Sequence, residues 1–220
     1  MRAAHGEPDL PPWLCVRPRA HYGGGVHRLE AIVKKLTTVG SAADVPAGED
    51  DYPRAAVAAI LREGAEGAEV FFIRRAESPK DPWSGHIAFP GGRHEPTDES
   101  LLATAIRETR EEVGIDLSRA ELVARLPDVP AFIRSKRGRL VVTPFVFAMR
   151  EQVTPTLNYE VAGTLWVPVA SFARGEGKGT YAFTWEDKPY ELPCYRLEPG
   201  QHVLWGMTHR MLESMLEALA

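Results

Sequence analysis

Three glutamates lie close together in the stretch RETREEVGI, residues 107–115. Glu108, Glu111 and Glu112 are spaced i, i+3 and i+4, so on a helix their carboxylates share one face within a single turn. Like charges at these spacings cost about 0.2–0.5 kcal/mol each, and the dipole at a helix C-terminus disfavours anions by about 0.3–1 kcal/mol apiece. Two interpretations follow: a solvated face partly neutralised by the neighbouring arginines, or a site for divalent cations such as Mg²⁺ or Mn²⁺, which prefer carboxylate and water oxygens.

The elements around this cluster can be predicted from the flanking residues. The run Pro-Thr-Asp at 96–98 offers a stop followed by an N-cap, and Gly114 stands where a C′ glycine belongs. The spacing therefore predicts a helix over residues 98–113. Residues 76–97, dense in proline and glycine, are expected to form a loop.

The rest of the chain alternates between strand-like and helix-like patterns. An apolar i, i+3, i+4, i+7 spacing predicts an amphipathic helix at 27–38, and a stripe of methionine and leucine over 207–219 predicts a second helix that packs on the core. The predicted strands are 55–61, 69–75, 121–129, 139–149, 164–172, 180–185 and 190–197. This alternation indicates an α/β or α+β domain with a mixed sheet. We assign residues 1–50 to an N-terminal extension and 51–220 to the domain.

Composition excludes several classes of protein. A chain of 220 residues with 44% hydrophobic and 25% charged residues is ordinary for a globular domain, and a net charge of -4 argues against a protein that coats nucleic acid. There is no apolar run of signal-peptide length in the first thirty residues, and no stretch long enough to span a bilayer. Cys15 and Cys194 lie far apart, without CxxC spacing, which favours a reduced, cytoplasmic protein.

The stretch GHIAFPGGRHEPTDESLLATAIRETREEVGI, residues 85–115, resembles the Nudix hydrolase signature. That signature is Gly, five residues, Glu, seven residues, then Arg-Glu-U-x-Glu-Glu-x-Gly-U, in which U is bulky and apolar. The positions in register are Glu99, Arg107, Glu108, Glu111, Glu112, Gly114 and Ile115. Two positions depart from it: Arg93 stands at the glycine position, so the loop from Gly92 to Glu99 is one residue longer, and Thr109 replaces the first apolar residue.

The resemblance implies the Nudix fold, a mixed sheet sandwiched between helices, and an enzyme that hydrolyses a nucleoside diphosphate linked to another group. Position by position, it implies that Glu108, Glu111 and Glu112 are ligands of Mg²⁺ or Mn²⁺, with one of them instead orienting or deprotonating the attacking water. Arg107 and Glu99 would brace the loop and the helix. Bound cations suit this reaction, because they neutralise phosphate oxygens and lower the pKa of coordinated water.

Further stretches are similar to the coenzyme A diphosphatase branch of that family: FFIRRAESP, SGHIAFPGGR, NYEVAGTLWVPV and LWGMTHRML. This branch implies coenzyme A as the substrate, with 3′,5′-ADP and 4′-phosphopantetheine as products. The branch's Arg and His before Gly-Gln-Val are absent here, where the chain reads KDPWSGHIAFP. The alternatives are therefore ADP-ribose, a nucleotide sugar or a nucleoside triphosphate as substrate, a nucleotide-sensing Nudix module without catalysis, and a structural domain with a decorated helix.

Several residues outside the glutamate cluster are candidates for the site. Glu160, in NYEV, matches a later glutamate of the branch and is our candidate general base, the alternative being a surface glutamate at a strand start. Arg74 and Arg75 end a predicted strand beside the site, where they can contact the diphosphate. The loop residues Gly91, Gly92 and Arg93 complete the predicted substrate-binding set, the glycines because they let the backbone turn closely beneath the metals.

The basic run of Arg134, Lys136, Arg137 and Arg139 has the chemistry to grip a 3′-phosphate, with Arg137 as the candidate, although a solvated hairpin tip is the commoner role for such a run. His86 and His94 flank the glycines, and we expect them to hydrogen-bond within the loop. Trp83 either stacks on a base or pins the loop. From its position alone, the N-terminal arm with its helix is a candidate for a homodimer contact or a lid.

Overall fold

The computed structural model describes residues 28–39, 52–78, 84–131, 140–185, 188–197 and 202–220. Its helices are α1 (Leu29–Val39), α2 (Leu101–Val113), α3 (Val169–Ala173) and α4 (Gly206–Leu219), with a 3₁₀ turn at Leu117–Arg119. Its strands are β1 (Arg54–Gly64), β2 (Gly67–Arg75), β3 (Ile87–Ala88), β4 (Gly91–Arg93), β5 (Glu121–Arg125), β6 (Val129–Ala131), β7 (Leu140–Met149), β8 (Val161–Pro168), β9 (Lys178–Trp185), β10 (Lys188–Leu197) and β11 (His202–Trp205).

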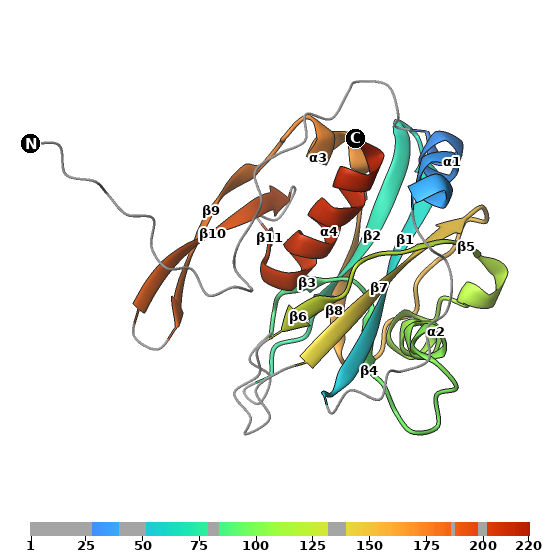
Figure 1. Ribbon diagram of the computed structural model, residues 1–220, viewed down its shortest axis with the longest axis horizontal. Helices are drawn as coiled ribbons and strands as arrows, with labels where there is room; N and C mark the ends of the chain where they lie inside the picture. Colours follow the sequence, from blue (N-terminus) through green and yellow to red (C-terminus); the bar gives the residue numbers. More distant parts are fainter. Residues whose placement is uncertain (1–27, 40–51, 79–83, 132–139, 186–187, 198–201) are drawn as a thin grey trace, which may run out of the picture.

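The main sheet is mixed, as the alternating pattern predicts. Strands β3, β2, β1, β7 and β5 follow one another across it, while β4, β6 and β8 pair with β1, β7 and β2. The long strands β1 and β7 run parallel, and the other pairings are antiparallel. A second sheet, with the order β11-β10-β9, extends to one side of the molecule (Figure 1).

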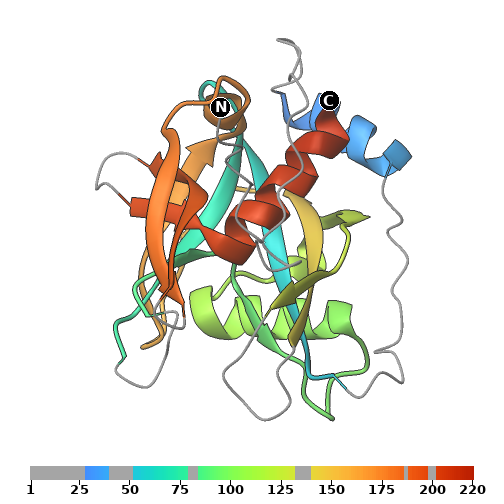
Figure 2. The ribbon, with the colours of Figure 1, turned by 60° about the vertical axis from the view of Figure 1, so that its left-hand side comes forward.

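Helices cover both faces of the main sheet, as Figure 2 shows by separating α2 from α1 and α4. On one face, α2 packs against alternate residues of β1, namely Ala56, Ala58 and Ile60. On the opposite face, α1, α3 and α4 enclose a larger core that includes Leu61 and Phe72. Side chains alternate between the two faces of a strand, so β1, buried on both, is a continuous apolar run.

The N-terminal helix belongs to this larger core. Four of its apolar residues, Leu29, Ile32, Val33 and Leu36, are buried in the same cluster as the residues of α4. Residues 1–27 lie outside the described part of the chain. The apolar face of α1 is therefore covered by its own chain, and a homodimer contact or lid formed by the arm stays a prediction.

Four predicted elements differ from the structure, and the first is the segment predicted as one strand, 121–129, which divides into β5 and the start of β6. Helix α2 begins at Leu101, with Ser100 as the N-cap, because the carboxylate of Asp98 is taken by other partners. The segment predicted as loop, 76–97, contains the short strands β3 and β4. The segment predicted as one strand, 164–172, divides at Pro168 into β8 and α3. Gly114 ends α2 with a φ of 66° and donates its N–H to Arg110, as a C′ glycine does.

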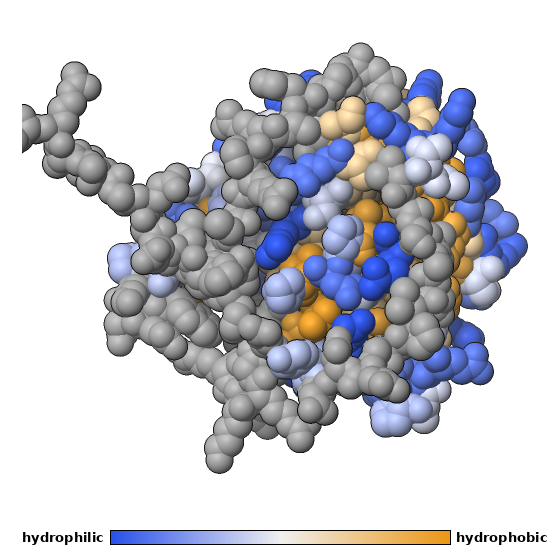
Figure 3. Space-filling view, in the orientation of Figure 1, coloured by the Kyte–Doolittle hydropathy of each residue, from blue (hydrophilic) through white to orange (hydrophobic). Residues whose placement is uncertain are grey.

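The surface agrees with the predicted globular class. On the face seen in Figure 1, apolar residues show near the centre, and polar side chains line the right-hand edge (Figure 3). Within the described ranges, no helix has the length and apolar character needed to cross a membrane.

Candidate functional site

Helix α2 carries the three glutamates from solvent into the protein interior. Glu111 has a side chain that is 56% exposed, and that of Glu108 is 16% exposed. Glu112 is 2% exposed, so the interpretation of the cluster as a solvated face does not hold for this residue. The sequence suggests Leu102, Ile106 and Val113 as the apolar stripe of α2, whereas its fully buried apolar residues are Leu101, Ala105 and Val113. The three carboxylates of this turn thus differ in burial, with Glu111 the most exposed and Glu112 the least.

Two consecutive glycines of β4 meet these carboxylates. The N–H of Gly91 donates to Oε2 of Glu112 at 2.9 Å. A Cβ at Gly91, where φ is 146°, would lie 2.3 Å from the carbonyl oxygen of Ala56, so only glycine fits there. A Cβ at Gly92 would lie 2.4 Å from the carboxyl carbon of Glu108. The glycine pair therefore lets the β4 backbone approach the acidic turn at van der Waals distance.

The charge of the buried glutamates is only partly compensated. Burial raises the pKa of Glu112 to about 7, and the negative charges of Glu108 and Glu160 add to the rise, against the Gly91 hydrogen bond and the charge of Arg75. Burial also raises the pKa of Glu108, against the lowering effect of Arg107. The arrangement of oxygen donors and excess negative charge suits a hard divalent cation.

Arg107 is the main positive charge that touches the cluster. Its Nη1 lies 3.0 Å from Glu108 Oε1 and 3.2 Å from Glu111 Oε2, and its Nη2 donates to the carbonyl of Arg93 at 3.2 Å. The guanidinium is anchored by Asp98, through Nε to Oδ1 at 2.7 Å and Nη2 to Oδ2 at 2.9 Å. Such a bidentate pair fixes the arginine in position and orientation.

The bracing carboxylate is Asp98 rather than Glu99, which we expected in this role. Glu99 is exposed, whereas the side chain of Asp98 is 4% exposed and also accepts from the hydroxyl of Thr104 at 2.8 Å. The signal was present in the sequence: counted from Gly92, the five-residue spacing of the signature ends at Asp98. With the longer loop, the residue that braces Arg107 is therefore Asp98, one position before Glu99.

The Asp98–Arg107 pair gives a prediction for acid stability. Arg107 holds the pKa of Asp98 well below its ordinary value of 3.8, so the pair contributes stability that is complete above pH 3.8 and is lost as pH falls below it. Asp98→Asn should lower the free energy of unfolding by about 1–3 kcal/mol at pH 7. In denaturant titrations at successive pH values, the gap to wild type should be constant above about pH 4 and shrink as pH falls below 3.8.

The control for this prediction is Asp116→Asn, since Asp116 is fully exposed and accepts from Ser118 at the start of the 3₁₀ turn. Asparagine serves equally well at such a cap, so this variant should unfold like wild type throughout. A gap between Asp98→Asn and wild type that is independent of pH would contradict a charge-based clamp.

His94 extends the hydrogen-bonded chain behind Asp98. Its Nδ1 lies 2.9 Å from Thr104 Oγ1, and its backbone N–H donates to the carbonyl of Arg54 at 2.9 Å. The loop hydrogen-bonding role expected for His94 is thus what the structure describes. The ring of His86 instead contacts the ring of Trp205, with centroids 4.9 Å apart, while its carbonyl accepts from the N–H of Arg75.

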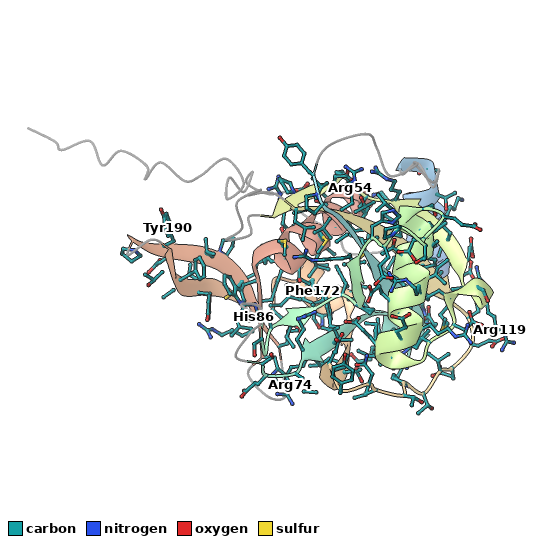
Figure 4. The ribbon with its side chains drawn as sticks, turned by 90° about the horizontal axis from the view of Figure 1, so that it is seen from below. Arg54, Arg74, His86, Arg119, Phe172 and Tyr190 are labelled. Carbon is teal, nitrogen blue, oxygen red and sulfur yellow. The ribbon has the colours of Figure 1, made fainter. Side chains whose placement is uncertain are left out.

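The two arginines at the end of β2 have different surroundings. Arg75 is the one whose charge reaches Glu112. Arg74 turns towards β8, where its Nη2 lies 3.4 Å from the carbonyl of Ala162, and Figure 4 shows it beside His86. Arg93 is exposed on β4. The substrate-binding roles of these three arginines stay predictions.

Glu160 belongs to the group in space. Its charge contributes to the raised pKa values of both Glu108 and Glu112, although it lies 47 positions after the last residue of α2. Four other candidates lie outside the described residues: Trp83, Arg134, Lys136 and Arg137. Arg139 and Cys15 also lie outside them, whereas Cys194 is a free, buried cysteine.

Comparison with known proteins adds an independent observation. A NUDIX domain model matches residues 52–185. The chloroplastic Nudix hydrolase 22 of Arabidopsis thaliana is 28% identical over 186 residues, which cover 83% of this chain and 61% of that protein. The mitochondrial coenzyme A diphosphatase of Homo sapiens is 29% identical over 137 residues, 62% of this chain and 56% of the relative.

Among solved structures, the MutT NUDIX hydrolase from Burkholderia pseudomallei superposes with a TM-score of 0.47 at 20% identity, over 75% of this chain and 98% of that one. The chain spans less than two thirds of the length of the curated relatives named above, 61% and 56% of them.

Proposed function

The chain belongs to the Nudix family, and from that premise we propose that it hydrolyses the diphosphate bond of a nucleoside diphosphate linked to another group. The observation that carries the proposal is the buried carboxylate of Glu112, held by the Gly91 N–H beside the carboxylates of Glu108 and Glu160. Burying a group of like charges lowers the stability of a fold. Such groups are therefore found mainly at functional sites, where they bind a ligand.

Nudix hydrolases generally use divalent cations, and the donor set here fits Mg²⁺ or Mn²⁺. Glu108, Glu111 and Glu112 are the residues that we assign as ligands, because all three offer hard carboxylate oxygens on one turn. In the described part of the chain, no three acidic, histidine or cysteine side chains lie close enough together to hold a metal ion, and Arg107 contacts two of the three glutamates. When bound, the cation neutralises phosphate oxygens and makes coordinated water more acidic.

The residues of the chain supply positioning and charge. In the proposed reaction, water attacks one phosphorus, the bridging P–O bond breaks, and the leaving phosphate keeps the bridging oxygen. The charge of Arg75 acts on Glu112, and we assign Arg75 to pair with a phosphate oxygen. Glu160 is the candidate that accepts the proton of the attacking water. Arg107, clamped by Asp98, positions Glu108 and Glu111.

Coenzyme A is the substrate that we propose within this class, with 3′,5′-ADP and 4′-phosphopantetheine as products. Support comes from the stretches similar to the coenzyme A diphosphatase branch and from a relative that carries that name. ADP-ribose, nucleotide sugars and nucleoside triphosphates are the alternatives that a test must include. The cytoplasmic location stays a prediction, since the relatives are named chloroplastic and mitochondrial.

A substrate panel tests the proposal. Purified protein is incubated with coenzyme A, ADP-ribose, a nucleotide sugar and a nucleoside triphosphate, first with Mg²⁺ and then with Mn²⁺, and the products are identified by mass spectrometry. We expect one diphosphate to be cleaved, with Glu111→Gln lowering kcat about 10²-fold or more, as loss of an electrostatic contact at a reaction centre does.

Glu99→Gln, which changes an exposed acid in the loop before α2, is the control and should keep wild-type kinetics. If several nucleotides bind tightly and none is cleaved, the chain is a sensing module and the proposed hydrolysis is wrong.

A further inference from the structure

The loop that carries Glu160 also displays large apolar side chains. In the described ranges, the exposed large hydrophobic residues are Tyr52, Leu157 and Tyr159, and two of these three lie on this loop. Tyr159 is 87% exposed, about twice the 41% of the other two. A tyrosine this exposed adds little to the core, and apolar surface gathered beside a charged site is typical of a ligand contact.

The loop is fixed in place by backbone hydrogen bonds. The N–H of Thr156 donates to the carbonyl of Val113 at 2.8 Å, and that of Asn158 to the carbonyl of Glu112 at 3.0 Å. The carbonyl of Glu160 accepts from the N–H of Ala76 at 2.7 Å. These bonds join the loop to the end of α2 and to the chain just after β2, so Tyr159 is displayed from a rigid support.

Tyr159 lies next to the acidic turn. It directly precedes Glu160, whose charge acts on Glu108 and Glu112. On its other side, Asn158 caps the backbone of Glu112 itself. A diphosphate held at α2 would therefore place the group attached to it within reach of the tyrosine ring.

We propose that Tyr159 is a substrate-binding residue whose ring stacks on the nucleobase of the nucleoside diphosphate. This inference rests on the proposed function of the α2 site and specifies how that site recognises a nucleoside. Every nucleobase offers a flat π-face, and stacking on an exposed aromatic side chain contributes binding without hydrogen-bond readout.

Kinetics of two variants at the same position test the stacking. Tyr159→Ala should raise KM for the cleaved diphosphate about tenfold and leave kcat within about twofold, because the ring binds the base and not the reacting atoms. Tyr159→Phe retains the ring and should keep the wild-type KM. Because the side chain is 87% exposed, neither variant should change the thermal unfolding temperature.

Tyr190→Ala is the control for removal of an aromatic ring elsewhere. Tyr190 lies on β10, in the hairpin that extends away from α2 (Figure 4), and its loss should leave KM unchanged. An unchanged KM in Tyr159→Ala would overturn the inference, as would a lower kcat with unchanged KM, which would mean that the tyrosine acts through Glu160.

Equilibrium binding separates this inference from the proposed hydrolysis. AMP and ribose 5-phosphate differ only by the base, and calorimetric titration should show that wild type binds AMP about tenfold more tightly and that Tyr159→Ala binds both alike. If no diphosphate is cleaved but this difference is found, the hydrolysis is wrong and the stacking stands. If cleavage proceeds and wild type binds AMP no better than ribose 5-phosphate, the stacking is wrong and the hydrolysis stands.

Discussion

Glu112→Gln is expected to stabilise the protein in the absence of divalent cations while removing its activity. Without a cation, Glu112 is a 2% exposed carboxylate that receives one backbone hydrogen bond and faces two other negative charges. Glutamine keeps a carbonyl oxygen for the Gly91 N–H and carries no charge. We expect its free energy of unfolding to exceed that of wild type by about 2–3 kcal/mol at pH 8, from a shift of the pKa to about 7.

The pH dependence of this gain has a defined sign. The pKa of Glu112 is raised from 4.5 to about 7, so the folded state favours the protonated acid. Below pH 4.5, Glu112 does not lower the free energy of unfolding of wild type. That free energy falls as pH rises through about 7, and the loss is complete above it. The two proteins should therefore unfold alike near pH 4.5 in EDTA and diverge towards pH 8, by about 5–10 °C for a chain of this size.

Divalent cations should reverse the order of the two proteins. Saturating Mg²⁺ should raise the unfolding temperature of wild type, because a cation that binds only the folded state stabilises it, and should have little effect on Glu112→Gln. Hydrolysis by the variant should fall about 10³-fold, or about 4 kcal/mol of transition-state stabilisation. A variant that is less stable than wild type in EDTA at pH 8 would contradict the idea that the charged Glu112 lowers the stability of the fold when no cation is bound.

Alanine at Gly91 and at Gly92 should have opposite consequences, although the two residues are adjacent. At Gly91, the backbone has a φ of 146° and the new Cβ would meet the backbone of Ala56 and Val57 at 2.3 and 2.5 Å. Strand β4 cannot move away from β1 without breaking the pairing between them. Gly91→Ala should therefore cost on the order of 3 kcal/mol or more of stability. At Gly92, the three atoms nearest to the new Cβ are those of the Glu108 carboxylate, at 2.4 to 2.6 Å.

A carboxylate at the end of a flexible side chain can move aside, so Gly92→Ala should fold nearly as well as wild type. Its kcat should nevertheless fall about 10²-fold, because a displacement of about 1 Å at a reacting centre has an effect of that size. Thermal unfolding and steady-state kinetics on both variants check the pair. Full activity in Gly92→Ala would show that the position of Glu108 is not important for the reaction, and an unchanged unfolding temperature in Gly91→Ala would contradict the close approach of β4 to β1.

Local sequence determined the elements of this fold, because each depends on residues near it in the chain. The apolar spacing located α1 and α4, and Gly114 located the end of α2. The runs of apolar residues located β1, β2 and β7, and their alternation with helices indicated a mixed sheet. The spacing of the glutamates placed them on one turn of α2, since the helical period fixes which side chains are neighbours.

The tertiary structure alone decided how deeply each glutamate is buried and what surrounds it. Burial of Glu112 depends on the angle at which α2 meets the sheet, which the apolar stripe does not specify to within one residue. The choice of Asp98 over Glu99 depends on how the loop before α2 turns, and the charge of Glu160 reaches α2 through a contact between distant parts of the chain. Periodicity is a local property, whereas burial and electrostatic coupling arise where separate segments meet, so the sequence identified the candidate ligands and the fold set their burial and charge environment.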